Sequence, residues 1–109
     1  MPYNVLTIHR FDREFKRLAK KYASLKGEYQ KLIEKLEKDP EIGIPLGDNL
    51  YKIRLAIASK GKGKRGGARI ITFLKTEQGN VYLLTIYNKG EQDTISDNEI
   101  RKILESEIE

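Results

Sequence analysis

The segment from Tyr51 to Tyr87 constrains the fold of this chain more than any other stretch. Apolar and cationic residues alternate from Tyr51 to Ile57, which predicts a β-strand with one buried face. Two more strands, Ile70–Leu74 and Val81–Tyr87, follow in the same segment, and a turn-like stretch joins them. Because strands that follow one another closely tend to pair antiparallel, we expect one small, mainly antiparallel sheet.

A strand and two helices are predicted before this sheet. The β-branched run Asn4–Ile8 is typical of a short strand. From Phe11 to Leu25 the apolar residues recur at helical spacing, with charged residues between them. We expect Gly27 to interrupt the helix, and a second helical pattern then continues until Asp39-Pro40 ends it. Two consecutive helices of this kind suggest an antiparallel pair packed on the sheet.

The remaining segments complete the predicted topology. Residues Glu41–Asn49 contain a proline and two glycines and predict a loop. Ser96 and Glu99 have the spacing of a capping box, which opens a short helix through Leu104. The expected order is β-α-α-β-β-β-α, an α+β fold with two N-terminal helices on one face of a small curved sheet. A chain of 109 residues fits a single domain over residues 1–109.

A cationic, glycine-rich connection follows the first strand of the segment Tyr51–Tyr87. From Tyr51 to Arg69 there is no acidic residue, and the seven cationic ones are Lys52, Arg54, Lys60, Lys62, Lys64, Arg65 and Arg69. The net charge of the whole chain is +5. Glycines let the backbone approach a ligand closely, and cations neutralise phosphates. The pattern predicts binding of a polyanion, and a solvated loop without a specific ligand is the alternative.

Composition narrows the chemistry. The chain has no cysteine, so it has no disulfide, no thiolate nucleophile and no cysteine-ligated metal site. His9 is the one histidine and lies far in sequence from the cationic connection, so we expect a structural or exposed role for it. We therefore predict no metal and no cofactor. No apolar run approaches the ~20 residues of a membrane span, and no signal pattern is present. A cytoplasmic protein without membrane contact is expected.

The order of elements and several short motifs resemble the RelE/ParE superfamily of type II toxins, and within it the HigB-like branch. The matching phrases are Lys52-Ile53-Arg54, Gly61 to Ile70, Tyr82 to Tyr87, Lys89-Gly90-Glu91 and Ser96 to Ile100. They occur in the order found in that branch, and the resemblance covers nearly the whole chain.

This resemblance implies a toxin that inhibits translation as a metal-independent endoribonuclease, cutting messenger RNA, usually in the ribosomal A site. It also implies a cognate antitoxin, which in HigB-like systems is a HigA-like protein with a helix-turn-helix domain. Relatives in the ParE branch poison DNA gyrase instead. A non-cleaving member of that kind, or a plain nucleic-acid-binding domain, is therefore the alternative.

Arg69 is the first candidate for catalysis because it begins an otherwise apolar strand. The resemblance implies that an arginine at this position contacts the scissile phosphate. A guanidinium group suits that role, since it binds phosphate oxygens bidentately and stays charged. The alternative is an arginine that pairs with a nearby acid. Tyr87, Lys89 and Glu91 are the expected proton carriers, because a ribonuclease without a metal needs a base and an acid.

The expected RNA-binding set consists of strand and loop cations. Lys52 and Arg54 project from one side of their strand, although ordinary polar alternation on a solvated face explains them equally well. The loop adds Lys60, Lys62, Lys64 and Arg65. Tyr82 and Tyr87 are weaker candidates for stacking on a base, because aromatic residues in strands more often serve packing.

Overall fold

The chain folds into five strands and three helices within the residues that the structure, a computed structural model, describes: 2–61, 63, 66–92 and 94–108. In chain order these elements are β1 (Asn4–Thr7), α1 (His9–Lys21), α2 (Leu25–Lys38), β2 (Ile44–Gly47), β3 (Leu50–Leu55), β4 (Ala68–Lys75), β5 (Asn80–Asn88) and α3 (Asp97–Glu107). Short 3-10 turns, Ala58–Lys60 and Thr76–Gln78, follow β3 and β4.

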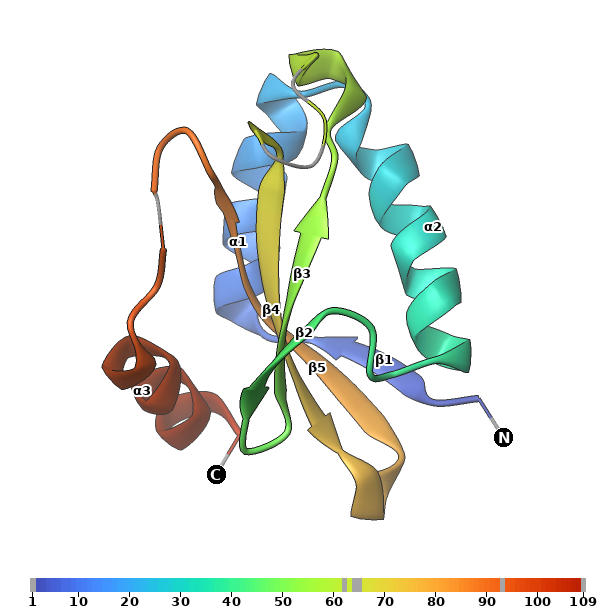
Figure 1. Cartoon of the computed structure of the whole chain (residues 1–109), viewed down its shortest axis with the longest axis vertical. Coiled ribbons are helices and arrows are strands. Elements are labelled where there is room, and N and C mark those ends of the chain that lie inside the picture. Colours follow the sequence, from blue (N-terminus) through green and yellow to red (C-terminus); the bar gives the residue numbers. More distant parts are fainter. Residues whose placement is uncertain (1, 62, 64–65, 93, 109) are drawn as a thin grey trace.

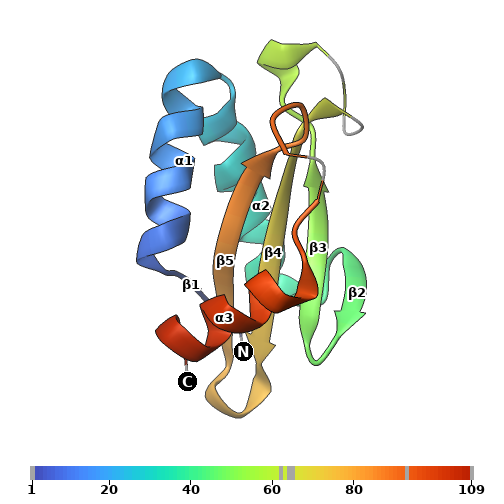
Figure 2. The ribbon, with the colours of Figure 1, turned by 90° about the vertical axis from the view of Figure 1, so that its left-hand side faces the viewer.

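The strands form one mixed sheet in the order β1-β5-β4-β3-β2. β1 is parallel to β5, and all the other neighbours are antiparallel. α1 and α2 lie on one side of this sheet, whereas α3 lies on the other side (Figures 1 and 2). The arrangement confirms the predicted α+β class with both N-terminal helices on one face.

The core lies between the sheet and the first two helices. α1 contributes Phe11 and Leu18, and α2 contributes Leu25, Leu32 and Leu36, all of them buried. Fully buried aliphatic residues of the sheet complete this core: Ile70, Val81, Leu83 and Ile86. Burial of each such side chain contributes roughly 1.5–3 kcal/mol. The packing therefore fixes which side of each strand faces the helices.

The prediction of a loop over Glu41–Asn49 is wrong in part, because this segment contains the edge strand β2. Ile44 pairs with Lys52, and Pro45 pairs with Tyr51. A proline is tolerated here because an edge strand has one side that needs no hydrogen bond. Asp48 and Asn49 then form a two-residue hairpin turn with φ angles of 54° and 64°. Both residue types tolerate positive φ, so the Asp-Asn pair is the signal that could have indicated the hairpin.

The helix boundaries also differ from the prediction. α1 begins at His9 and ends at Lys21, and Leu25 begins α2 instead of ending α1. The break lies at Tyr22–Ser24, whereas Gly27 lies inside α2, where a side chain at its position would meet nothing within 4 Å. Leu25 continues the apolar spacing of α1 in the sequence, but in the structure it is fully buried as the first residue of α2. No helix in the described part of the chain is long and apolar enough to cross a membrane.

α3 begins as the capping-box pattern predicts. The Ser96 hydroxyl oxygen accepts a hydrogen bond from the backbone N–H of Glu99 at 3.2 Å. The Glu99 carboxylate does not return to Ser96 but pairs with Arg10 of α1 at 2.7 Å. Arg10 also pairs with Glu14, one turn further along α1, at 3.4 Å. This ion-pair chain links α3 to the start of α1.

Candidate nucleic-acid interface

Three functional candidates form one row across the centre of the sheet. Arg54 of β3 is the direct cross-strand partner of Arg69 of β4, and Arg69 is the direct partner of Tyr87 of β5. Direct partners in an antiparallel sheet have Cβ atoms about 4.5–5.5 Å apart on the same face. The row lies on the α3 side of the sheet, because strand alternation sets Arg54 with Leu50 and Arg69 with Phe73, and both of these apolar residues line a groove beside α3. We call this side of β3, β4 and β5 the cationic face.

The row brings two positive charges together. Like charges directly opposite each other destabilise a sheet, so this cross-strand pair concentrates positive charge at an energetic cost. Arg54 is exposed, whereas Arg69 is only 5% exposed, and its Nη1 donates to the carbonyl oxygen of Ala68 at 3.2 Å. Tyr87 is also buried, at 4% exposed. Arg54 therefore meets solvent first, and Arg69 and Tyr87 form the floor of the face.

Lys52 extends the cationic face by one step along β3. It lies two residues from Arg54, and strand alternation places both side chains on the same side. Lys52 is half-buried and pairs with Ile71 on β4 and with Ile44 on β2. The predicted common projection of Lys52 and Arg54, away from the two N-terminal helices, thus agrees with the register.

The glycine-rich connection is pinned at its end. A Cβ atom on Gly67 would lie 2.1 Å from the carbonyl oxygen of Leu55, so this close approach of β3 and β4 requires glycine. The Gly67 carbonyl oxygen also accepts a hydrogen bond from the Lys89 backbone N–H at 3.0 Å. Lys89 thus borders the connection. Lys62, Lys64 and Arg65, which were predicted to bind RNA, lie outside the described residues.

Lys60 and Glu91 do not lie in the row Arg54–Arg69–Tyr87. Both contact Asn88 at the end of β5. The Nδ2 group of Asn88 donates to the Tyr22 hydroxyl at 3.0 Å and to Glu91 Oε1 at 3.1 Å. Its Oδ1 atom accepts from the Lys60 ammonium group and, at 3.1 Å, from the Gly90 N–H. Asn88 is 2% exposed, so these four bonds satisfy a buried amide completely. We call Tyr22, Lys60, Asn88 and Glu91 the Asn88 cluster.

The Asn88 cluster changes the chemistry expected of Glu91. The hydrogen bond from Asn88 is the main cause that holds the pKa of Glu91 below its usual value. Burial opposes it, and the hydrogen bond and charge of Arg17 and the charge of Lys21 lower the pKa further. Glu91 also forms an ion pair with Arg17 of α1 at 3.3 Å. A carboxylate held ionised in this way is poorly suited to donate a proton near neutral pH.

Sequence reasoning did not identify Asn88, Tyr22 or Arg17 as parts of a site. Asn88 ends the β5 pattern and resembled an ordinary strand terminus, while Tyr22 resembled a core residue of α1. Their contacts span 66 residues of sequence between Tyr22 and Asn88, so no local pattern marks them. The described residues contain no group of three or more His, Cys, Asp or Glu side chains that could hold a metal ion.

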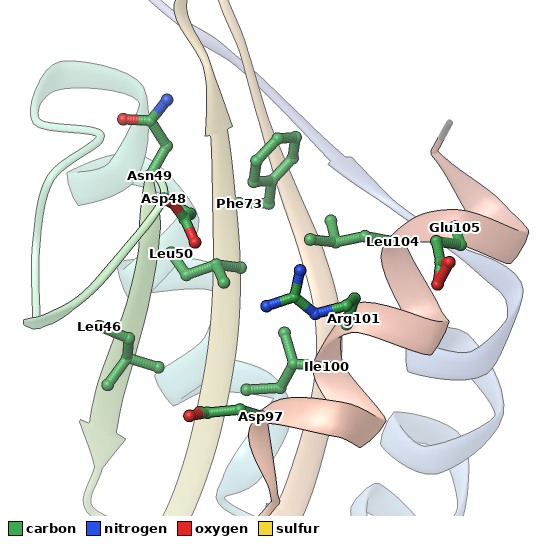
Figure 3. A pocket seen from close by; sticks show the side chains of 10 residues that line it. All are labelled: Leu46, Asp48, Asn49, Leu50, Phe73, Asp97, Ile100, Arg101, Leu104 and Glu105. Carbon is green, nitrogen blue, oxygen red and sulfur yellow. The ribbon is translucent and has the colours of Figure 1, made fainter.

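A groove of about 690 Å³ lies between α3 and the β2–β3 hairpin. Its apolar lining comes from Leu46, Leu50 and Phe73 of the sheet side and from Ile100 and Leu104 of α3 (Figure 3). Arg101 projects from α3 into this groove. Leu50 and Phe73 share the cationic face with Arg54 and Arg69, because strand alternation sets them on the same side. One half of this face is therefore apolar and the other half is cationic.

The fold and this face define a class: a small α+β domain with helices on one side of the sheet and strand-borne cations on the other. Residues 9–107 match the family model described as the RelE toxin of the RelE/RelB toxin–antitoxin system. Since this match spans most of the chain, the protein belongs to the RelE toxin family.

Solved structures of RelE proteins have the same fold. An Escherichia coli RelE mutant in the free state is 17% identical, covers 85% of this chain and 90% of its own, and superposes with a TM-score of 0.63. The intact E. coli RelBE toxin–antitoxin complex gives 18% identity, coverage of 79% and 95%, and a TM-score of 0.61. The RelBE2 complex of Mycobacterium tuberculosis is 18% identical, and the match covers 81% of this chain and 92% of the other, with a TM-score of 0.58. The RelE-like fold expected from the resemblance is thereby confirmed.

Proposed function

We propose that this RelE-family toxin inhibits translation by cutting messenger RNA endonucleolytically. The observation that carries this proposal is the cross-strand pair Arg54–Arg69 with Tyr87 beside it. Two arginines in adjacent strands can neutralise a phosphodiester and the additional negative charge that it develops during attack, and their strands hold them within a narrow range of positions. Family membership supports the same conclusion independently.

In the proposed reaction a 2′-hydroxyl loses its proton to a base and its oxygen bonds to the adjacent phosphorus. The bond from phosphorus to the 5′-oxygen of the next nucleotide breaks and an acid protonates that oxygen, which leaves a 2′,3′-cyclic phosphate and a 5′-hydroxyl. Arg69 stabilises the negative charge that develops on the phosphoryl oxygens, and Arg54 and Lys52 hold the flanking backbone. The arginines supply charge stabilisation without a metal ion. Lys60, Lys62, Lys64 and Arg65 are proposed to add phosphate contacts from the connection, with Lys60 limited by its bond to Asn88.

Three residues are the proton carriers in this proposal, and we rank them by their distance along the sheet from Arg69 and by their contacts. Tyr87 comes first because it is the direct partner of Arg69. Lys89 follows, since its backbone adjoins Gly67 at the edge of the connection. Glu91 comes last, because its contacts with Arg17 and Asn88 direct it toward α1 and lower its pKa.

We further propose that a cognate antitoxin covers the cationic face and blocks it. The RelE structures in complex with antitoxins give the precedent. The resemblance to the HigB-like branch favours a HigA-like antitoxin with a helix-turn-helix domain. The same resemblance favours action on the ribosome in the cytoplasm.

Induction of the wild-type chain, followed by primer extension on a defined message, tests the proposed activity. We expect new 5′ ends within the coding region, and we expect them to disappear when the antitoxin is co-expressed. DNA breaks with intact message would instead identify a gyrase poison. Growth without either lesion would identify a plain nucleic-acid-binding domain. Comparison with and without translating ribosomes determines whether cleavage depends on the ribosome.

A further inference from the structure

The outer surface of α1 carries a second group of cations that the proposed cleavage does not use. Five of its exposed side chains are positive: Arg13, Lys16, Arg17, Lys20 and Lys21. Arg13, Lys16, Arg17 and Lys20 recur at i, i+3, i+4 and i+7, which places them on one side of the helix. Since each residue rises about 1.5 Å, this row is about 10 Å long. We call the five residues the α1 stripe.

The stripe is unfavourable for the helix alone. Like charges four residues apart destabilise a helix, and the stripe contains three such pairs: Arg13–Arg17, Lys16–Lys20 and Arg17–Lys21. Within the described residues, Arg17 is the one stripe member with an acidic partner, Glu91. The exposed lysines of α2 differ, because Glu34 and Glu37 lie among Lys31, Lys35 and Lys38, whereas the acids of α1, Asp12 and Glu14, precede Lys16, Arg17, Lys20 and Lys21. The charge on α1 therefore suits an external anion.

The stripe reaches the cationic connection through Tyr22. The Lys21 ammonium group lies 5.5 Å from the centroid of the Tyr22 ring, and the Lys60 ammonium group lies 5.4 Å from it. Lys60 ends the 3-10 turn that opens the connection between β3 and β4. One band of positive charge thus runs along α1, past the Tyr22 ring, to the connection that joins the strands of the cationic face.

The environment of α1 selects the kind of partner. Its apolar side, with Phe11 and Leu18, is buried in the core and cannot insert into a lipid surface. The stripe itself is charged and linear, and it is continuous with a surface proposed to bind RNA. A polymer with regularly spaced negative charges matches such a band better than a folded acidic protein does.

We propose that the α1 stripe binds the phosphates that flank the segment held at the cationic face, so that one RNA strand runs past Tyr22 and along α1. This inference rests on the proposed function for the identity of the polymer. The α1 stripe would then be a second phosphate-binding surface, here called the track, and affinity would increase with the length of the RNA. The stripe contributes to binding of long strands and not to the bond-breaking step.

Fluorescence anisotropy with two 2′-O-methyl RNA oligonucleotides, which cannot be cut at the 2′-hydroxyl, tests the track. Their lengths of about 4 and about 16 nucleotides bracket the usual sites for single strands. The test variant combines Arg13→Gln, Lys16→Gln and Lys20→Gln and keeps Arg17, which holds Glu91. The control combines Lys31→Gln, Lys35→Gln and Lys38→Gln on α2, which removes the same charge.

The wild type is expected to bind the long strand more tightly than the short one. The α1 variant should bind the long strand about tenfold more weakly than the wild type. The slope of log affinity against log salt concentration should become shallower by about 2, which is about 0.7 for each of three lost phosphate contacts. Its affinity for the short strand should match the wild type, and the α2 control should keep the full gain with length. Removal of like-charge pairs should leave thermal stability unchanged or raised.

The inference is overturned if the α1 variant loses affinity equally for the short and the long strand. It is also overturned if the α1 and α2 variants lose the same affinity for the long strand, since either result indicates a general effect of charge. Unchanged binding by the α1 variant also overturns it and directs the stripe toward a protein partner. Cleavage of unmodified RNA is measured separately. A length gain that depends on α1 in a chain that cuts no RNA supports the track and refutes the proposed nuclease activity.

Discussion

Two neighbouring rows of residues in β3, β4 and β5 differ in role: one stabilises the fold and the other forms the proposed site. Ile53, Ile70 and Ile86 are cross-strand partners on the helix-covered face and are 4%, 0% and 1% exposed. The adjacent row of partners, Arg54–Arg69–Tyr87, lies on the opposite face. A register slip of one residue would exchange the two rows. The aliphatic row therefore positions the arginines, although it touches no ligand.

The comparison also separates two kinds of burial. The isoleucines are buried because apolar packing stabilises the fold, whereas Arg69 is nearly as buried and carries a charge that water would otherwise solvate. Evolution of a more stable sheet would favour an apolar residue at Arg69. Our proposal assigns this arginine a role in binding phosphate, and the following predictions test the distinction between the two rows in order of expected effect.

Ile70→Ala should have the largest effect on stability. It removes a fully buried side chain from the aliphatic row and should lower the free energy of unfolding by about 2–5 kcal/mol. Urea denaturation followed by circular dichroism measures this loss. Because Ile70 touches no RNA in our proposal, cleavage per folded molecule should stay near the wild-type rate. A large loss of activity in the fully folded variant would show that the two rows are not separable.

Asn88→Leu should cost about 2 kcal/mol of unfolding free energy. Leucine has a similar size but forms no hydrogen bonds. Tyr22, Lys60 and Glu91 would each lose their bond to the buried amide. Tyr22→Phe removes one of the four bonds and serves as the matched control, with an expected loss of about 1 kcal/mol. Equal stability of Asn88→Leu and the wild type would mean that the Asn88 cluster does not hold the connection.

Arg54→Ala should leave stability within about 0.5 kcal/mol, since the side chain is exposed and next to another arginine. RNA binding should weaken, and the slope of log affinity against log salt should fall by about 0.7 if one phosphate contact is lost. Titration of a non-cleavable RNA at several salt concentrations measures the slope. An unchanged slope would exclude Arg54 from the interface and weaken the comparison of the two rows.

Glu91→Gln should have a small effect on stability, and the size of that effect should depend on pH. The folded pKa of Glu91 is lowered, so its stabilising contribution is present above the usual value of 4.5 and is lost as the pH falls through the folded pKa. The carboxylate is largely exposed, so the variant should lose no more than about 1 kcal/mol at pH 7. Melting curves at pH 7 and pH 3 should show this difference shrinking at the lower pH. If the difference in stability between the variant and the wild type is the same at both pH values, the effect comes from packing and not from the charge of Glu91.

The sequence predicted those parts of the molecule that depend on local pattern. The strands around Ile53, Ile70 and Ile86 and the capping serine Ser96 follow from alternation and from spacing, and the structure confirms them. Periodicity also placed Lys52 and Arg54 on one face. These features are decided by residues close together in the chain, which is why they could be read from it.

The parts that the sequence did not predict depend on distant contacts. β2 has a proline and weak strand character, and it exists because it pairs with β3. The pairing of Arg54 with Arg69 requires the register of two strands, and the grouping of Glu91 with Arg17 requires the docking of α1. No local pattern could show that Glu91 turns toward a helix 74 residues away in sequence.

The rate of message cleavage by Arg69→Ala, measured against the wild type on translating ribosomes, tests the central claim most directly. Loss of the charge that stabilises the phosphoryl oxygens should slow cleavage about 10²–10³-fold while the variant stays folded. Cleavage at the wild-type rate by a folded Arg69→Ala chain would contradict the account, because the cationic row would then not be the site of the reaction.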